Sequence, residues 1–178
     1  MTTLIGILDR LLRPLERFLG YLAGLIVLVL MVLGVVEVIA RSLFNRPIHG
    51  SIDIIEQLMV PVAALGIAYC QSIFGNVRMT LLTQKFEGRT KWVAEAFTLL
   101  IATIVVAIYL NGSALNLMRA VTLGGDTPEI GIPLWYGMAC VTCALSVLLL
   151  RLFVQLLEAL RLIAVPNDQS AIFEISPH

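Results

Sequence analysis

Residues 18–44 read FLGYLAGLIVLVLMVLGVVEVIARSLF, a run of 27 residues in which Glu37 and Arg41 are the only acidic or basic side chains. A bilayer has a hydrocarbon core about 30 Å thick, which about 20 helical residues cross. The chain of 178 residues is 59% hydrophobic and 13% charged, whereas soluble domains are about 45–50% apolar and about 25% charged. Because so few polar residues could not cover this apolar surface in water, the sequence predicts an integral membrane protein.

Three further stretches are also long and apolar enough to cross a bilayer, roughly residues 52–74, 92–117 and 130–163. The sequence therefore predicts an all-α integral membrane protein in which four transmembrane helices form one domain over residues 18–163. Residues 164–178 are polar and are expected to form a short cytoplasmic tail.

Residues 1–17 are predicted to be a separate element. Their apolar side chains recur at spacings of three or four: Leu4, Leu8, Leu11, Leu15 and, just beyond, Phe18. Charged side chains fill the opposite face, a pattern typical of an N-terminal amphipathic interfacial helix that lies along the membrane surface. The alternative is that this segment simply extends the first span.

Basic residues predict the orientation, since Lys and Arg are concentrated in cytoplasmic segments. Most of them precede the first span, separate the second from the third, or follow the fourth: Arg10, Arg13, Arg17, Arg78, Lys85, Arg89, Lys91, Arg151 and Arg161. Both termini should therefore be cytoplasmic, and the loops near residues 45–51 and 123–129 should face outward.

Four ionisable residues lie in or near the predicted outer half of the first two spans: Glu37, Arg41, Asp53 and Glu56. Glu37 and Arg41 share a helix face, and Arg41 and Glu56 are expected at similar depth in an antiparallel hairpin. These groups could form a structural ion pair, an interface with another membrane subunit, or a proton or ion relay. Their clustering near one side argues against a relay across the membrane.

The outward side offers five polar residues that could touch another protein, or could simply be solvated: Arg46, His49, Arg119, Asp126 and Glu129. Haem ligation by histidine is not expected, because His49 and His178 both lie outside the spans. The sequence contains no metal-ligand cluster, nucleophile–base arrangement or phosphate loop. We therefore expect no cofactor and no enzymatic activity.

Four segments together resemble a known family. They read EVIARSLFN (37–45), IDIIEQL (52–58), GIAYCQSIFGNVR (66–78) and TPEIGIPLW (127–135). In this order and with four spans, the chain resembles the small permease subunit (DctQ-like) of tripartite ATP-independent periplasmic (TRAP) transporters. The resemblance covers roughly residues 20–160.

The resemblance implies a subunit of a sodium-coupled transporter for organic acids in the bacterial inner membrane. A periplasmic DctP-like protein would bind the substrate, and a large DctM-like permease would carry the substrate and sodium sites. This chain would not bind the substrate. Binding to nucleic acid is not expected either, because twelve acidic residues balance twelve basic ones. It would be a static scaffold for the large subunit and would help dock the binding protein. The alternatives are a self-contained small transporter or channel, and a membrane anchor subunit of a redox complex.

Overall fold

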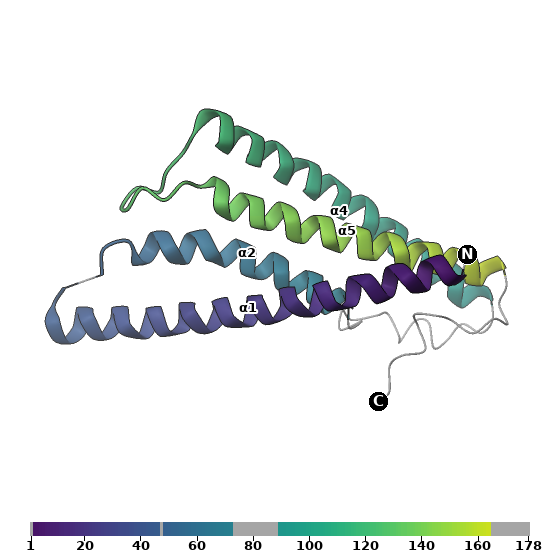
Figure 1. Ribbon diagram of the computed structural model, residues 1–178, viewed down its shortest axis with the longest axis horizontal. Coiled ribbons are helices and arrows are strands. Elements are labelled where there is room, and N and C mark those ends of the chain that lie inside the picture. Colours follow the sequence, from purple (N-terminus) through teal and green to yellow (C-terminus); the bar gives the residue numbers. More distant parts are fainter. Residues whose placement is uncertain (1, 47, 73–88, 165–178) are drawn as a thin grey trace.

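Four long helices form two antiparallel hairpins in the computed structural model, which describes residues 2–46, 48–72 and 89–164. Helix α1 (Thr2–Phe44) pairs with α2 (Ser51–Ser72), and α4 (Arg89–Leu123) pairs with α5 (Trp135–Ala164). The α1–α2 and α4–α5 loops lie at one end of the molecule, which we call the loop end (Figure 1). The N-terminus and the last turns of α5 lie at the opposite end (Figure 1).

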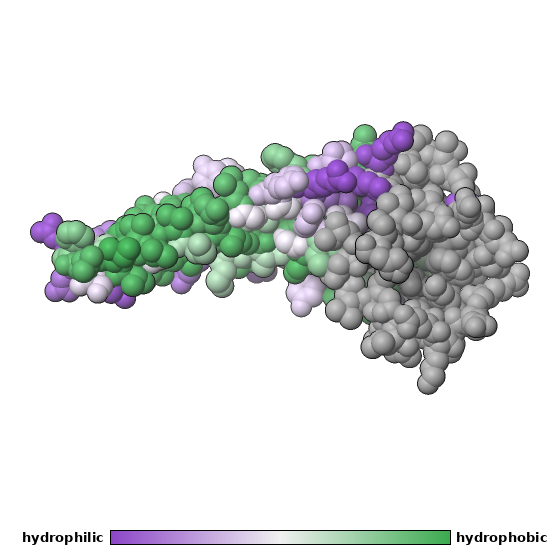
Figure 2. Space-filling model, turned by 90° about the horizontal axis from the view of Figure 1, so that it is seen from below, coloured by the Kyte–Doolittle hydropathy of each residue, from purple (hydrophilic) through white to green (hydrophobic). Residues whose placement is uncertain are grey.

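All four helices are long and apolar enough to span a membrane. The candidate spans are Arg10–Phe44, Ser51–Ser72, Ala96–Leu123 and Trp135–Arg161. Seen from below the view of Figure 1, much of the surface is hydrophobic, and hydrophilic residues lie at the loop end and toward the opposite end (Figure 2). These findings confirm the predicted all-α membrane fold.

The N-terminal segment is continuous with the first span. Helix α1 runs without interruption from Thr2 through Pro14, so residues 2–17 are continuous with the helix of the first span. In this extension Leu12 and Glu16 are buried, whereas Leu11 and Leu15 are exposed. An apolar face is therefore left uncovered, and its position in the membrane interface stays a prediction. The predicted tail lies almost wholly outside the described residues.

Helix α5 is the centre of the bundle. It packs against α4, α2 and α1, and α1 also packs against α2. Within the described part of the chain, the backbone of α4 lies close to that of α5 alone, and its Leu99, Ala102 and Val106 pack against a cluster formed by Ala68 of α2 with two leucines of α5. Helix α5 begins at Trp135, five residues later than predicted, because the preceding residues fold into a compact loop.

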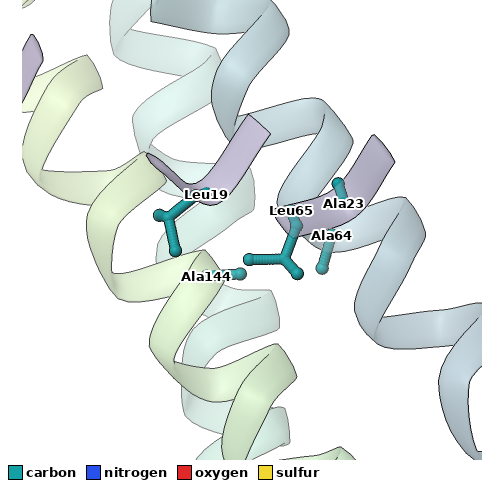
Figure 3. Packing of buried hydrophobic residues seen from close by; sticks show 5 residues of the cluster. All are labelled: Leu19, Ala23, Ala64, Leu65 and Ala144. Carbon is teal, nitrogen blue, oxygen red and sulfur yellow. The ribbon is translucent and has the colours of Figure 1, made fainter. Parts of the chain in front are cut away.

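The core where three helices meet is built mainly from small residues. Leu19 and Ala23 of α1 pack with Ala64 and Leu65 of α2 and with Ala144 of α5 (Figure 3). Small side chains let helix backbones approach closely in a membrane, where van der Waals packing replaces the hydrophobic effect as a driving force. The core therefore joins the two hairpins through α5.

A glycine brings α1 and α2 even closer together. A Cβ atom added to Gly20 would lie 2.6 Å from the Tyr69 ring, whereas one added to Gly24 would meet nothing within 4 Å. Only the first glycine of the Gly20-x-x-x-Gly24 pattern therefore makes a close contact.

Candidate functional site

The two hairpins are joined at the loop end by a carboxylate that binds backbone amides. Asp53, in the first turn of α2, is only 2% exposed. Its Oδ2 accepts hydrogen bonds from the backbone N–H groups of Glu129 and Ile130, both at 2.9 Å. Hydrogen bonds to an ionised acceptor are stronger than neutral ones. Asp53 therefore ties the start of α2 to the α4–α5 loop.

Glu129 makes the reciprocal connection. Its Oε2 accepts a hydrogen bond from the backbone N–H of Gly50 at 2.7 Å, just before α2 begins. Gly50 has φ +82°, and a Cβ atom there would lie 2.4 Å from Cγ2 of Ile130. A side chain at position 50 would therefore be strained and would also collide with Ile130. We call the contacts of Asp53, Glu129 and Gly50 the carboxylate junction.

Glu37 fixes the α1–α2 loop in the same manner. Its Oε2 accepts a hydrogen bond from the Ile48 backbone N–H at 3.0 Å, and its Oε1 accepts one from Arg41 Nη2 at 2.9 Å. The expected ion pair between Arg41 and Glu56 is not formed: within the described residues, Arg41 pairs with Glu37 instead. A partner four residues away on the same helix face is close without any adjustment between helices.

The α4–α5 loop is itself well structured. Thr127 donates its backbone N–H to the Ile132 carbonyl, and its hydroxyl accepts the Ile132 N–H, both at 2.9 Å. Leu134 N–H donates to the Gly125 carbonyl at 2.9 Å. Gln57 of α2 donates to the carbonyls of Pro133 and Leu134, each at 3.3 Å. The loop is therefore held both internally and by α2.

The five residues predicted to face outward and to touch another protein are all exposed, but they lie in different segments. Arg46 and His49 lie in the α1–α2 loop, Asp126 lies in the α4–α5 loop, and Arg119 lies in the last turns of α4. Glu129 is also exposed as a residue, yet it binds the Gly50 amide.

A second polar cluster, at the opposite end of the bundle, was not predicted. Arg151 and Gln155 of α5 are each 1% exposed, and Glu16 of α1 is fully buried. Arg151 Nε lies 3.7 Å from Glu16 Oε1, and Gln155 Oε1 accepts a hydrogen bond from Gln71 Nε2 of α2 at 2.7 Å. We call these four residues the inner polar cluster.

The sequence did contain a signal for this cluster. Arg151 and Gln155 are four residues apart on α5, and Glu16 lies between Leu12 and Leu19 on the face of α1 that is buried. Polar residues at helical spacing on a core-facing stripe indicate a polar helix–helix contact. Taken as charges alone, Arg151 indicates orientation and Glu16 indicates a solvated helix face, and neither interpretation predicts the contact between them.

The polar side chains described above connect helices and loops to one another. Among the described residues, no group of three or more His, Cys, Asp or Glu side chains could hold a metal ion. The carboxylates at the loop end mostly accept backbone amides of their own chain. Such an arrangement fixes helices and loops in position.

The family assignment comes from comparison with known sequences. The model of the DctQ component of tripartite ATP-independent periplasmic transporters matches residues 30–162, about three quarters of the chain. The chain belongs to the DctQ family. The comparisons with curated proteins and with solved structures gave no significant match.

Membership of the DctQ family makes this chain a component of a TRAP transport system. With its four apolar helices, it is a multi-pass membrane protein. The DctQ match contains the carboxylate junction and the α4–α5 loop, whereas the N-terminal extension of α1 precedes it.

Proposed function

We propose that this chain is the static scaffold of a sodium-coupled TRAP transporter for organic acids in the bacterial inner membrane. It would support a large DctM-like permease that carries the substrate and sodium, and would help dock a periplasmic DctP-like binding protein. Family membership supports the transport role. The carboxylate junction is the observation that supports a static scaffold, because it joins the two hairpins across their loops.

The position of the polar groups also favours a scaffold over a path for substrate through this chain. The junction lies at one end of the bundle and the inner polar cluster at the other. Between them, the three-helix core is made of Leu and Ala side chains (Figure 3). A carboxylate substrate would need polar groups to replace its hydration, and an apolar core has none to offer.

Docking of the binding protein is proposed at the loop end. Arg46, His49 and Asp126 are exposed there on loops that the carboxylates hold in place. A surface that is already ordered loses little conformational entropy on binding. This proposal requires the loop end to be periplasmic and both termini to be cytoplasmic, as the distribution of Lys and Arg predicts.

Reconstitution in proteoliposomes tests the function. The large permease and the binding protein should take up substrate along a sodium gradient only when this chain is present. The chain alone should transport nothing. Uptake by this chain without partners, or full uptake in its absence, would refute the scaffold role.

Docking needs a separate test, with Arg46→Glu and His49→Glu combined and Arg10→Glu as the control at the opposite end. The loop-end variant should weaken uptake at low concentrations of binding protein, and excess binding protein should restore it. Unchanged dependence on the binding protein would refute docking while leaving the scaffold role intact.

A further inference from the structure

A groove opens on the side of the bundle between α2 and α4, with α5 as its floor. Its volume is about 490 Å³. Val60 of α2 and Ile108 of α4 line its walls, and Val141 and Leu145 line its floor. Within the described residues the backbones of α2 and α4 do not approach each other closely, so the groove opens between them on the side of the bundle that would face the membrane interior.

One end of this groove is polar. Glu56 lies five residues after the start of α2, and Asn116 lies seven residues before the end of α4. At about 1.5 Å per residue, they lie about 8 and about 10 Å from the loop-end termini of their helices. Both are exposed, and neither forms a hydrogen bond or ion pair with its own chain in the described part. A carboxylate and an amide thus stand at similar depth on opposite walls.

The polar end of the groove is poorly suited to contact with lipid acyl chains. Ionisable and polar side chains within spans usually face protein or water, because placing them in hydrocarbon is costly. The exposed face of α1 is different: Leu25, Leu28 and Val32 are apolar and exposed, which suits contact with acyl chains. The charge of Glu56 instead calls for a cationic partner in the groove.

We propose that a transmembrane helix of the large permease subunit covers this groove and places a Lys or Arg side chain beside Glu56. This inference rests on the proposed function and adds the surface and the chemistry of the contact. A helix is about 10 Å across, so it would lie over the groove and insert side chains rather than enter it. Its apolar side chains would fill the space above Val141 and Leu145, and its basic residue would lie at the depth of Asn116.

Photocrosslinking in the assembled transporter tests the location. A photoreactive amino acid replaces Val60 in the groove or, as the control, Leu28 on α1; these native side chains are 55% and 56% exposed. We expect position 60 to crosslink to the large subunit and position 28 to give only lipid adducts. Lipid adducts alone at position 60, or crosslinks to the large subunit from position 28 alone, would overturn the proposal.

The charge is tested separately by Glu56→Lys and the isosteric Glu56→Gln. Because Glu56 does not bond to its own chain, both variants should unfold at the wild-type temperature when purified alone. Breaking a buried charge pair across an interface typically weakens binding by about 30-fold or more, so Glu56→Lys should lose the large subunit on co-purification, and Glu56→Gln should retain less of it than the wild type. Wild-type assembly by Glu56→Lys, or destabilisation of the isolated chain by Glu56→Gln, would overturn the proposal.

These experiments distinguish a failure of the groove proposal from a failure of the proposed function. If the unmodified chain and the large subunit assemble and transport but the groove gives no crosslink, this inference fails alone. If the unmodified chain forms no complex with the large subunit, the proposed function fails as well.

Discussion

Replacing Asp53 with alanine should loosen the α4–α5 loop from the start of α2 while the helices stay folded. The Asp53 carboxylate accepts two backbone N–H groups at 2.9 Å and is 2% exposed. Hydrogen bonds to a charged group each contribute about 1.5–3 kcal/mol. Water can enter at the loop end and replace part of this, so we expect a loss of about 3 kcal/mol, the lower limit for two such bonds.

Hydrogen–deuterium exchange measures this loss at the amides concerned. A loss of about 3 kcal/mol corresponds to about 100-fold faster exchange, since 1.4 kcal/mol is a factor of ten. The amides of Glu129 and Ile130 should show it, because they expose their N–H groups by local opening. Asp53→Asn keeps an oxygen acceptor without the charge and should show a smaller increase.

Asp126→Ala is the matched control. It removes the same charge from the same loop, but Asp126 is exposed and its side chain accepts no hydrogen bond from another described residue. Equal exchange at Glu129 and Ile130 in the Asp53→Ala and Asp126→Ala variants would refute the role of the carboxylate junction.

Two further substitutions test the packing of α1, each by thermal unfolding in detergent. Gly20→Leu should lower the unfolding temperature because its side chain would collide with Tyr69, whereas Gly24→Leu should have little effect; equal effects would contradict the close contact between α1 and α2. Glu16→Ala should lower stability by about 3–5 kcal/mol because it removes the carboxylate that lies 3.7 Å from the buried Arg151, whereas Arg17→Ala, exposed on the same turn, should cost little. If Arg17→Ala is as damaging as Glu16→Ala, the inner polar cluster does not anchor α1.

Hydrophobic runs predicted the helices well because each span must satisfy its backbone N–H and C=O groups by hydrogen bonds within itself. Helix α1 ends at Phe44, where the first apolar run also ends. The start of α5 was wrong by five residues, since apolar residues such as Ile130 and Ile132 belong to a compact loop. Hydropathy cannot distinguish an apolar loop that packs on a neighbour from the first turn of a helix.

The sequence singled out ionisable residues near the start of α2 and the end of α1, but it did not predict the partners of their side chains. Asp53 was predicted to take part in an ion pair, a subunit interface or a relay, whereas its partners in the structure are backbone amides 76 and 77 residues away. Arg41 was assigned to Glu56 from depth alone, whereas the structure pairs it with Glu37. Position in the sequence gives the depth of a residue in its span but not the direction of its side chain around the helix axis. That direction decides which side chains meet.

In the proposed function, this chain stays rigid while the large subunit moves. Spin labels at Phe44 and Leu123, two exposed residues at the loop-end termini of α1 and α4, report the distance between the hairpins in the assembled transporter. We predict the same distance distribution without sodium, with sodium, and with sodium, substrate and binding protein together. A distribution that shifts with these conditions would show that this chain changes conformation during transport, and would contradict its role as a static scaffold.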